Sequence, residues 1–314
     1  MKIFITGLAG MIGFHTAKYL QPLGHEIAGI DNFNDYYEVS LKRERARILK
    51  DQYGIDTIEA DIRTIDYNTV LKDVDLVLHL AAYANPRHAL AEPQLYIDTN
   101  ITGTQRLIEG VERAGIKSVV YASSSCVMHG QPLPWNEHDR PGFQNNPYGW
   151  SKRANECQFM HSNIDKTVGL RFFTVYGPYG RPDMALFGFT KKILENETIE
   201  LYNYGDMKRD FTFVEDIVQG VSLVINNVHQ QTDKVAEIYN IGFGESVDLM
   251  DFLHHIEHQL GKKAITNLLP KHPADVPATW SDTTKIQQLG YQPTTNIASG
   301  VEKFVAWYRD YYQI

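Results

Sequence analysis

Tyr148 and Lys152 are the residue pair with the clearest chemical potential in the sequence. They stand four positions apart, so on a helix both side chains lie on one face. A nearby ammonium group favours the phenolate, which would lower the tyrosine pKa from its ordinary value of about 10 and let the hydroxyl act as a base. Ser123, Ser124 and Ser125 precede the pair and offer hydroxyls that can orient a reacting oxygen. These five residues predict a site of proton transfer.

A second group of residues has the spacing of a dinucleotide-binding loop. Its three glycines, in a G-x-x-G-x-x-G pattern, are Gly7, Gly10 and Gly13. Such glycines permit a tight turn, a close approach of the backbone to a pyrophosphate and close packing of a helix on a sheet. Met11 and Ile12 begin the helix that follows, and a helix amino terminus attracts anions. We therefore expect this loop to bind a dinucleotide. The loop also strengthens the prediction of an active site, because a tyrosine and lysine pair without such a loop would be weak support for any activity.

Asp31 indicates which dinucleotide the loop binds. It ends the second predicted strand, about 20 residues beyond the loop, where a carboxylate accepts both ribose hydroxyls and would repel a 2′-phosphate. The sequence thus predicts NAD rather than NADP. Ligands of parallel sheets lie beyond the carboxyl ends of the strands. The residues expected at those ends, beside the adenosine and the pyrophosphate, are Asn32, Asp61, Ile62, Leu80, Ala81 and Ala82.

The first half of the chain alternates short apolar runs with longer amphipathic stretches, which is typical of βαβ units. Six runs rich in Val, Ile and Leu predict buried parallel strands at 2–6, 26–31, 56–60, 76–80, 119–122 and 167–172. Helices are expected at 11–20, 92–114 and 147–162. The predicted fold class is therefore α/β, with a doubly wound parallel Rossmann sheet.

After Phe172 the sequence becomes rich in glycine and proline, which indicates a second, smaller α/β lobe. We expect the dinucleotide-binding domain to span 1–172 together with about 212–242. The second lobe, which would bind the substrate, should then comprise 173–211 and about 243–314. A short strand at 199–202 and an aromatic helix at 304–312 are predicted within it.

Composition and charge exclude several classes of protein. The 314 residues include 30 basic and 38 acidic side chains, for a net charge of −8, which opposes binding to nucleic acid. No run reaches the about 18 apolar residues that a membrane span needs, and the first residues do not resemble a signal peptide. We expect a cytoplasmic protein without a metal site. Cys126 and Cys157 fit no disulfide or zinc pattern, and we predict two buried free thiols.

These motifs together resemble the extended short-chain dehydrogenase/reductase family of NAD-dependent nucleotide-sugar epimerases and dehydratases. Further marks are DTN at 98–100, RFFTVYGP at 171–178, RDF at 209–211 and DVP at 275–277. The strings DNFNDYY at 31–37, GLRFFTVYGPYGRPDMALF at 169–187 and YNYGDMKRDF at 202–211 are most similar to the UDP-glucuronate 4-epimerase group. The resemblance covers essentially the whole chain.

The resemblance implies an epimerisation at carbon 4 of a UDP-sugar, with NAD as cofactor and a transient 4-keto sugar. Tyr148 would take the hydroxyl proton, and Ser125 would supply the hydrogen-bonding hydroxyl, a task that its neighbours Ser123 and Ser124 can share. Lys152 would contact the nicotinamide ribose and lower the tyrosine pKa. Asn100 and Phe173 would also lie beside NAD. We hypothesise that Arg181 and Thr174 recognise a carboxylate at carbon 6, because arginine offers a charge-assisted fork. Diphosphate and ribose contacts are expected from Arg209, Asp275 and Arg87.

The chemistry of the serine segment favours an epimerase within this family. Dehydratases and decarboxylases place a carboxylate beside the reactive hydroxyl, whereas here Ser125 is followed by Cys126. Three departures from the family pattern concern the sugar: His129, His272 and the stretch 83–87. The alternatives are an epimerase of UDP-glucose or a UDP-N-acetylhexosamine, and a non-catalytic NAD-binding regulatory protein. The resemblance also implies a homodimer and a role in polysaccharide synthesis.

Overall fold

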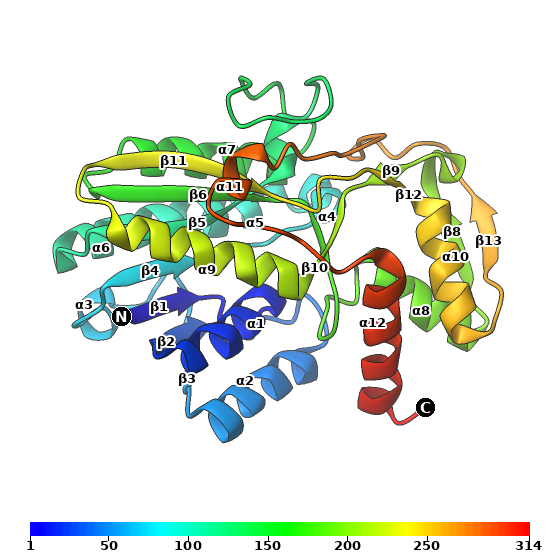
Figure 1. The fold of residues 1–314 in the computed structure, drawn as a ribbon, viewed down its shortest axis with the longest axis horizontal. Helices are drawn as coiled ribbons and strands as arrows, with labels where there is room; N and C mark the ends of the chain where they lie inside the picture. The colour runs from blue at the N-terminus through cyan, green and yellow to red at the C-terminus, as the bar shows by residue number, and fades with distance from the viewer.

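The computed structural model describes residues 1–314 and contains a seven-stranded parallel sheet (Figure 1). Its strand order is β11-β6-β5-β4-β1-β2-β3, and every neighbouring pair is parallel. The strands are β1 (Lys2–Thr6), β2 (Glu26–Asp31), β3 (Thr57–Glu59), β4 (Leu76–His79), β5 (Ser118–Ser124), β6 (Lys166–Phe172) and β11 (Val235–Ile241). The predicted α/β fold with a doubly wound parallel sheet is confirmed.

Strand β11 is the one member of this sheet that the sequence patterns did not predict. It pairs with β6 along its whole length, from Val235 opposite Lys166 to Ile241 opposite Phe172. Only its last three residues are fully buried. Strand β11 mixes apolar and polar residues and lacks the continuous apolar run on which strand prediction relied. The prediction of a buried strand at 56–60 is wrong in its burial, because β3 is the opposite edge strand and none of its residues is buried.

Helices cover both faces of the sheet. Helices α1 (Met11–Leu20), α2 (Val39–Tyr53) and α9 (Val214–Gln230) pack on one face with the side chains of Ile3 and Ile5. Helices α3 (Tyr67–Val70), α6 (Thr104–Ala114) and α7 (Pro147–Met160) pack on the other face with Phe4. The helix predicted at 92–114 is interrupted: α5 (Pro93–Tyr96) passes into a π-helix, η2 (Ile97–Gly103), before α6.

A separate cluster of 17 buried residues forms the core of the second lobe and extends to Leu41 on helix α2. It lies beside one end of the sheet (Figure 1). Phe211 and Phe252 stack at its centre with ring centroids 3.9 Å apart. Its main elements are α8 (Ala185–Glu195), β8 (Thr198–Leu201), α10 (Leu249–Leu260), β13 (Ile265–Leu268) and α12 (Ile297–Tyr312). Strand β8 and the second half of α12 lie where the strand at 199–202 and the helix at 304–312 were predicted.

Several short elements complete the fold. They are β7 (Thr174–Tyr176) paired with β10 (Phe211–Phe213), β9 (Lys208–Arg209) paired with β12 (Val247–Asp248), α4 (Pro86–Ala91) and α11 (Thr284–Gln287). None of the helices combines the length and apolar character that crossing a bilayer requires. The prediction of two buried cysteines is wrong, because Cys157 lies on the exposed side of α7 and Cys126 is half-buried.

A buried ion pair fastens α7 to the sheet. The carboxylate of Glu156 accepts hydrogen bonds from Arg171 Nε at 2.8 Å and from Ser123 Oγ at 2.7 Å. Arg153 reaches the same carboxylate from the preceding turn, at 2.9 Å. Burial alone would raise the pKa of Glu156, but hydrogen bonding and charge from Arg171 outweigh it and hold the pKa below its ordinary value. The carboxylate therefore stays ionised inside the protein.

We predict that Glu156→Gln lowers the free energy of unfolding by roughly 3–5 kcal/mol, because it leaves the buried Arg171 without its counter-charge. Urea denaturation at neutral pH measures this loss. Since the folded-state pKa of Glu156 is depressed, its contribution is present at neutral pH and fades as the pH falls below about 4. Asp51→Asn, which breaks an exposed pair with Arg47, is the control and should change stability little. Equal stability of the two variants would contradict the prediction.

Candidate active site

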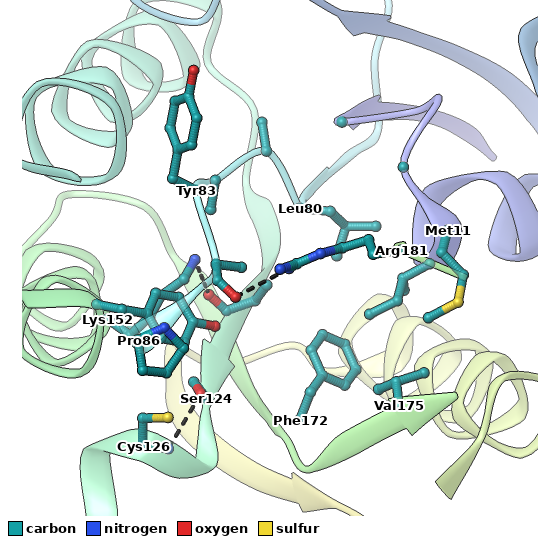
Figure 2. A pocket seen from close by; sticks show the side chains of 18 of the residues that line it. Met11, Leu80, Tyr83, Pro86, Ser124, Cys126, Lys152, Phe172, Val175 and Arg181 are labelled. Carbon is teal, nitrogen blue, oxygen red and sulfur yellow. Dashed lines mark hydrogen bonds between the residues drawn. The ribbon is translucent and has the colours of Figure 1, made fainter. Parts of the chain in front are cut away.

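A cavity of about 420 Å³ lies beyond the carboxyl ends of the central strands, next to the second lobe. Segments from both parts of the chain line it, as Figure 2 shows for Met11, Leu80, Ser124, Lys152 and Arg181. Most residues predicted for the site line this cavity. They are Gly7, Gly10, Met11, Ile12, Gly13, Asp31, Asn32, Ile62, Leu80, Ala81, Ala82, Ser123, Ser124, Ser125, Tyr148, Lys152, Phe173, Thr174, Arg181, Arg209 and Asp275.

The glycine loop packs so tightly that side chains would not fit. Gly7 has a φ of +75°, and a Cβ on it would lie 2.9 Å from the backbone nitrogen of Ala81. A Cβ on Gly13 would overlap the carbonyl oxygen of Gly7. The turn is held by Gly10 N–H, which donates to the Gly7 carbonyl at 3.0 Å. The glycine loop and the amino terminus of α1 thus border the cavity, where a pyrophosphate can approach the backbone N–H groups.

Asp31 ends β2 at the rim of this loop. Its carboxylate accepts backbone hydrogen bonds from Phe33 at 2.9 Å and from Ala9 at 3.1 Å. Burial raises its pKa, while these bonds and the charges of Lys42 and Arg45 oppose the shift. A buried acceptor in this place fits the ribose hydroxyls of an NAD adenosine.

Two residues predicted for the cofactor stand behind the cavity wall. Asp61 accepts from the amide of Asn32 at 3.0 Å and from Arg63 at 2.7 Å. Burial would raise its pKa, but these hydrogen bonds hold it at about 2. Asn100 is fully buried in the π-helix, where its amide donates to the Tyr83 carbonyl and to Ser151 Oγ. Both residues shape the wall through their neighbours.

Tyr148 opens α7 and lies half-buried beside Ser124. Burial raises the pKa of Tyr148 above its ordinary value, while hydrogen bonding by Ser124 and the positive charge of Arg181 act in the opposite direction. That Lys152 lowers the pKa of Tyr148 stays a prediction. The Lys152 amine donates to the Ala122 carbonyl at 3.0 Å, and burial lowers its own pKa to about 8.

The three serines differ in what their hydroxyls contact. Ser123 donates to Glu156 and so faces the buried ion pair. Ser124 Oγ accepts from the Cys126 backbone at 3.2 Å and lies within hydrogen-bonding reach of Tyr148. Ser125 lines the cavity at the start of the short helix η3 (Ser125–Met128). Ser124 and Ser125 are therefore the serines placed to hydrogen-bond a reacting oxygen.

Arg181 crosses the cavity toward the side of Lys152 and Ser124, as seen in Figure 2. Its Nη1 donates to the Ala84 carbonyl at 3.0 Å. Its Nε and Nη2 donate to Asp183 at 3.0 and 2.6 Å, an ion pair that the sequence did not predict. Thr174, at the start of β7, lines the same part of the cavity.

A second set of charges lies toward the second lobe. Arg87 pairs with Asp275 at 2.7 Å and stacks over the ring of Tyr202, with its guanidinium carbon 4.0 Å from the centroid. His272 meets the same ring edge-on at 5.6 Å. Arg209 lines the cavity nearby, whereas Arg87 acts on it from outside through Asp275. These cations suit a diphosphate, and the aromatic ring suits a flat base.

Sequence reasoning missed the segment after β2 as part of the wall. Asn34, Tyr36, Tyr37 and Lys42 all line the cavity. Lys42 Nζ donates to the Asn34 carbonyl at 2.6 Å, and burial lowers its pKa to about 8. Their position after the carboxyl end of β2 was the available signal, since ligands gather at that edge of the sheet.

Comparison with known proteins agrees with this geometry. A family profile described as "NAD dependent epimerase/dehydratase family" matches residues 3–242. The chain is 38% identical to protein CapI of Staphylococcus aureus, over the whole of both chains. It is 37% identical to UDP-glucuronate 4-epimerase 4 of Arabidopsis thaliana, over 99% of this chain and 76% of the relative.

A solved structure is similar along nearly the whole chain. It is UDP-glucuronic acid 4-epimerase from Bacillus cereus in complex with UDP-glucuronic acid and NAD. The TM-score is 0.93 at 31% sequence identity, covering 99% of this chain and 100% of the other. The similarity thus includes both the glycine loop and the helix of Tyr148.

We predict that Gly13→Ala weakens NAD binding at least about ten-fold, the equivalent of one lost charge-assisted hydrogen bond. The added methyl group overlaps the Gly7 carbonyl oxygen and must push α1 away from the loop. Titration calorimetry of the cofactor-free protein with NAD measures the change. Gly188→Ala is the matched control. Gly188 also lies in a helix, α8, and the nearest atom to its added Cβ would be the Pro182 carbonyl oxygen at 3.5 Å, an ordinary contact. Unchanged affinity in Gly13→Ala would show that the loop does not hold the pyrophosphate.

Proposed function

Because the chain belongs to the NAD-dependent epimerase/dehydratase family, we propose that it interconverts UDP-glucuronate and UDP-galacturonate by epimerisation at carbon 4. One observation carries this proposal: Tyr148, Ser124 and Arg181 meet in the cavity that the glycine loop opens into. The relatives and the solved structure named above support both the reaction and NAD as cofactor.

Tyr148 and the serines would carry the proton transfer. NAD, when bound, would supply a reversible hydride acceptor for carbon 4, so the reaction would have no net redox change. Tyr148 accepts the proton of the 4-hydroxyl, helped by the Ser124 hydrogen bond and by the charge of Arg181. Ser125 holds the same oxygen, and the Lys152 amine keeps its place against Ala122 beside the ribose site. After the 4-keto sugar has turned over, reduction of its other face would require Tyr148 to return the proton to oxygen 4, which regenerates the hydroxyl.

The acids around the reacting centre favour epimerisation over elimination. The carboxylates that line the cavity are Asp31, at the adenosine end, and Asp275, which Arg87 binds. Glu156 lies behind Ser123, where Arg171 and Arg153 neutralise it. No carboxylate therefore stands beside Tyr148 to remove a proton from the carbon next to the keto group.

We propose the division of labour between the lobes on the same grounds. Residues 1–172 with about 212–242 would hold NAD, and 173–211 with about 243–314 would hold the sugar nucleotide. Arg181 and Thr174 would bind the carboxylate at carbon 6. Arg209, Asp275 and Arg87 would contact the diphosphate and the uridine ribose.

The family resemblance further supports a cytoplasmic homodimer that supplies polysaccharide synthesis. Sedimentation equilibrium tests the dimer, and a monomer at micromolar concentration would reject it.

Incubation of the purified protein with UDP-glucuronate, without added reductant, should yield UDP-galacturonate with no pentose product and no net NADH. Chromatography that separates the 4-epimers measures this. Tyr148→Phe should lower kcat by about 10²- to 10⁴-fold while NAD stays bound, because only the proton acceptor is lost. Turnover of UDP-glucose or UDP-N-acetylglucosamine instead would reassign the sugar. Bound NAD with no turnover of any UDP-sugar would indicate a regulatory protein.

Arg181→Ala should raise the KM for UDP-glucuronate about ten- to a hundred-fold, because a charge-assisted contact to the carboxylate is lost. The KM for UDP-glucose, which lacks the carboxylate, should rise far less. Steady-state kinetics with both substrates measures the difference. Equal effects on the two substrates would mean that Arg181 does not bind the carboxylate at carbon 6.

A further inference from the structure

The carboxylate of Asp183 is the meeting point of three segments that are distant in sequence. Oδ2 accepts from Arg181 Nη2 at 2.6 Å, from Asn85 Nδ2 at 2.7 Å and from Tyr36 Oη at 2.9 Å. Oδ1 accepts from Arg181 Nε at 3.0 Å. We call these four residues, Tyr36, Asn85, Arg181 and Asp183, the Asp183 strap. It joins the segment after β2, the segment after β4 and the segment after β7.

The strap lies at the wall of the cavity. Tyr36 and Arg181 line the cavity, whereas Asp183 and Asn85 hold them from behind. Asn85 also caps α4, because its Oδ1 accepts from the backbone of Arg87 at 2.9 Å. The segments that the strap connects therefore surround the space between the glycine loop and the sugar end. They cannot move apart without breaking several hydrogen bonds at one carboxylate.

Arg181 keeps binding capacity while it is held. A guanidinium has five N–H groups, and three of them are engaged by Asp183 and Ala84. One N–H on each terminal nitrogen stays free for a substrate carboxylate. A long side chain that is ordered in advance loses less entropy when its ligand arrives. The negative charge of Asp183 works against this gain, because it repels a second carboxylate.

We propose that Asp183 is a positioning residue that holds Arg181 toward carbon 6 of the sugar and, through Tyr36 and Asn85, keeps the cavity closed around NAD. The part that concerns the sugar rests on the proposed function; the part that concerns NAD does not. Asp183 does not line the cavity, so both effects would pass through its partners. For the affinity of the sugar, the gain from ordering Arg181 in advance outweighs the loss from repulsion between Asp183 and the substrate carboxylate.

The cofactor arm of the test measures how fast excess isotopically labelled NAD replaces NAD bound to the protein. Asp183→Asn should exchange NAD about ten-fold faster, because a charge-assisted hydrogen-bond centre is lost. Tyr36→Phe, which removes one donor, should show a smaller increase. Asp165→Asn is the control: Asp165 pairs with Lys117 and Lys234 before β6, away from the cavity, and its exchange rate should match the wild type. Wild-type exchange in Asp183→Asn would overturn this part.

Asn85→Asp provides a variant for the case in which Asp183→Asn fails to fold. Aspartate caps a helix as well as asparagine, so α4 keeps its cap. The new carboxylate faces Asp183. The hydrogen bond of 2.7 Å that Asn85 donates to Asp183 is thereby replaced by repulsion between two negative charges. NAD exchange should be accelerated as in Asp183→Asn. Slow exchange in this variant would reject the strap.

The substrate arm compares Asp183→Asn in the wild-type and Arg181→Ala backgrounds. In the wild type, KM for UDP-glucuronate should rise about five- to ten-fold while kcat changes less than about three-fold. In the Arg181→Ala background, Asp183→Asn should raise KM no further, because Asp183 acts on the sugar through Arg181. A fall of KM in both backgrounds would mean that repulsion dominates and would overturn the proposal. If the wild type does not convert UDP-glucuronate, the proposed function fails, and the exchange rates alone decide the strap.

Discussion

Helix α7 carries Tyr148, Lys152 and Glu156 on successive turns of one face, and Glu156 binds Ser123 on β5 and Arg171 on β6. A desolvated ion pair tolerates little displacement, because each charge loses its only compensation when the other moves. The pair therefore fixes the rotation and depth of α7 against the sheet. The positions of Tyr148 beside Ser124 and of Lys152 beside Ala122 follow from it.

The place of the cavity follows from the strand order. The chain proceeds outward from β1 in one direction and returns to β4 on its other side, so the loops after these two strands diverge to opposite faces. The space between them is where a doubly wound sheet binds its ligand. The glycine loop after β1 and Leu80 to Ala82 after β4 border that space. The second lobe borders the same space through Thr174, Arg181, Arg209 and Asp275, which line the cavity.

The charge inside the cavity runs opposite to that of the whole molecule. The chain carries a net charge of −8, yet the cavity is lined by Lys42, Lys152, Arg181 and Arg209 against Asp31 and Asp275. A concave surface of one sign focuses its field and concentrates ligands of the other sign. A dinucleotide and a sugar nucleotide each bring a diphosphate, and a uronate adds a carboxylate. The cations are thus distributed where the proposed ligands would carry their charges.

Local regularities determined what the sequence could predict. The ends of β1, β2 and α1 were predicted to the residue, because continuous apolar runs and a glycine loop are encoded by neighbouring positions. The π-helix at Ile97–Gly103, the edge strand β11, the turn of Ser123 toward Glu156 and the pairing of Arg181 with Asp183 were decided by the tertiary structure. The first three rest on contacts between segments far apart in the chain, as when β11 pairs with β6. The Arg181 pair joins near neighbours, but its geometry depends on Tyr36 and Asn85, which come from other strands' ends. Such contacts leave no periodic pattern in the sequence. The residue types of the site could therefore be predicted from the sequence, but the partners that orient them could not.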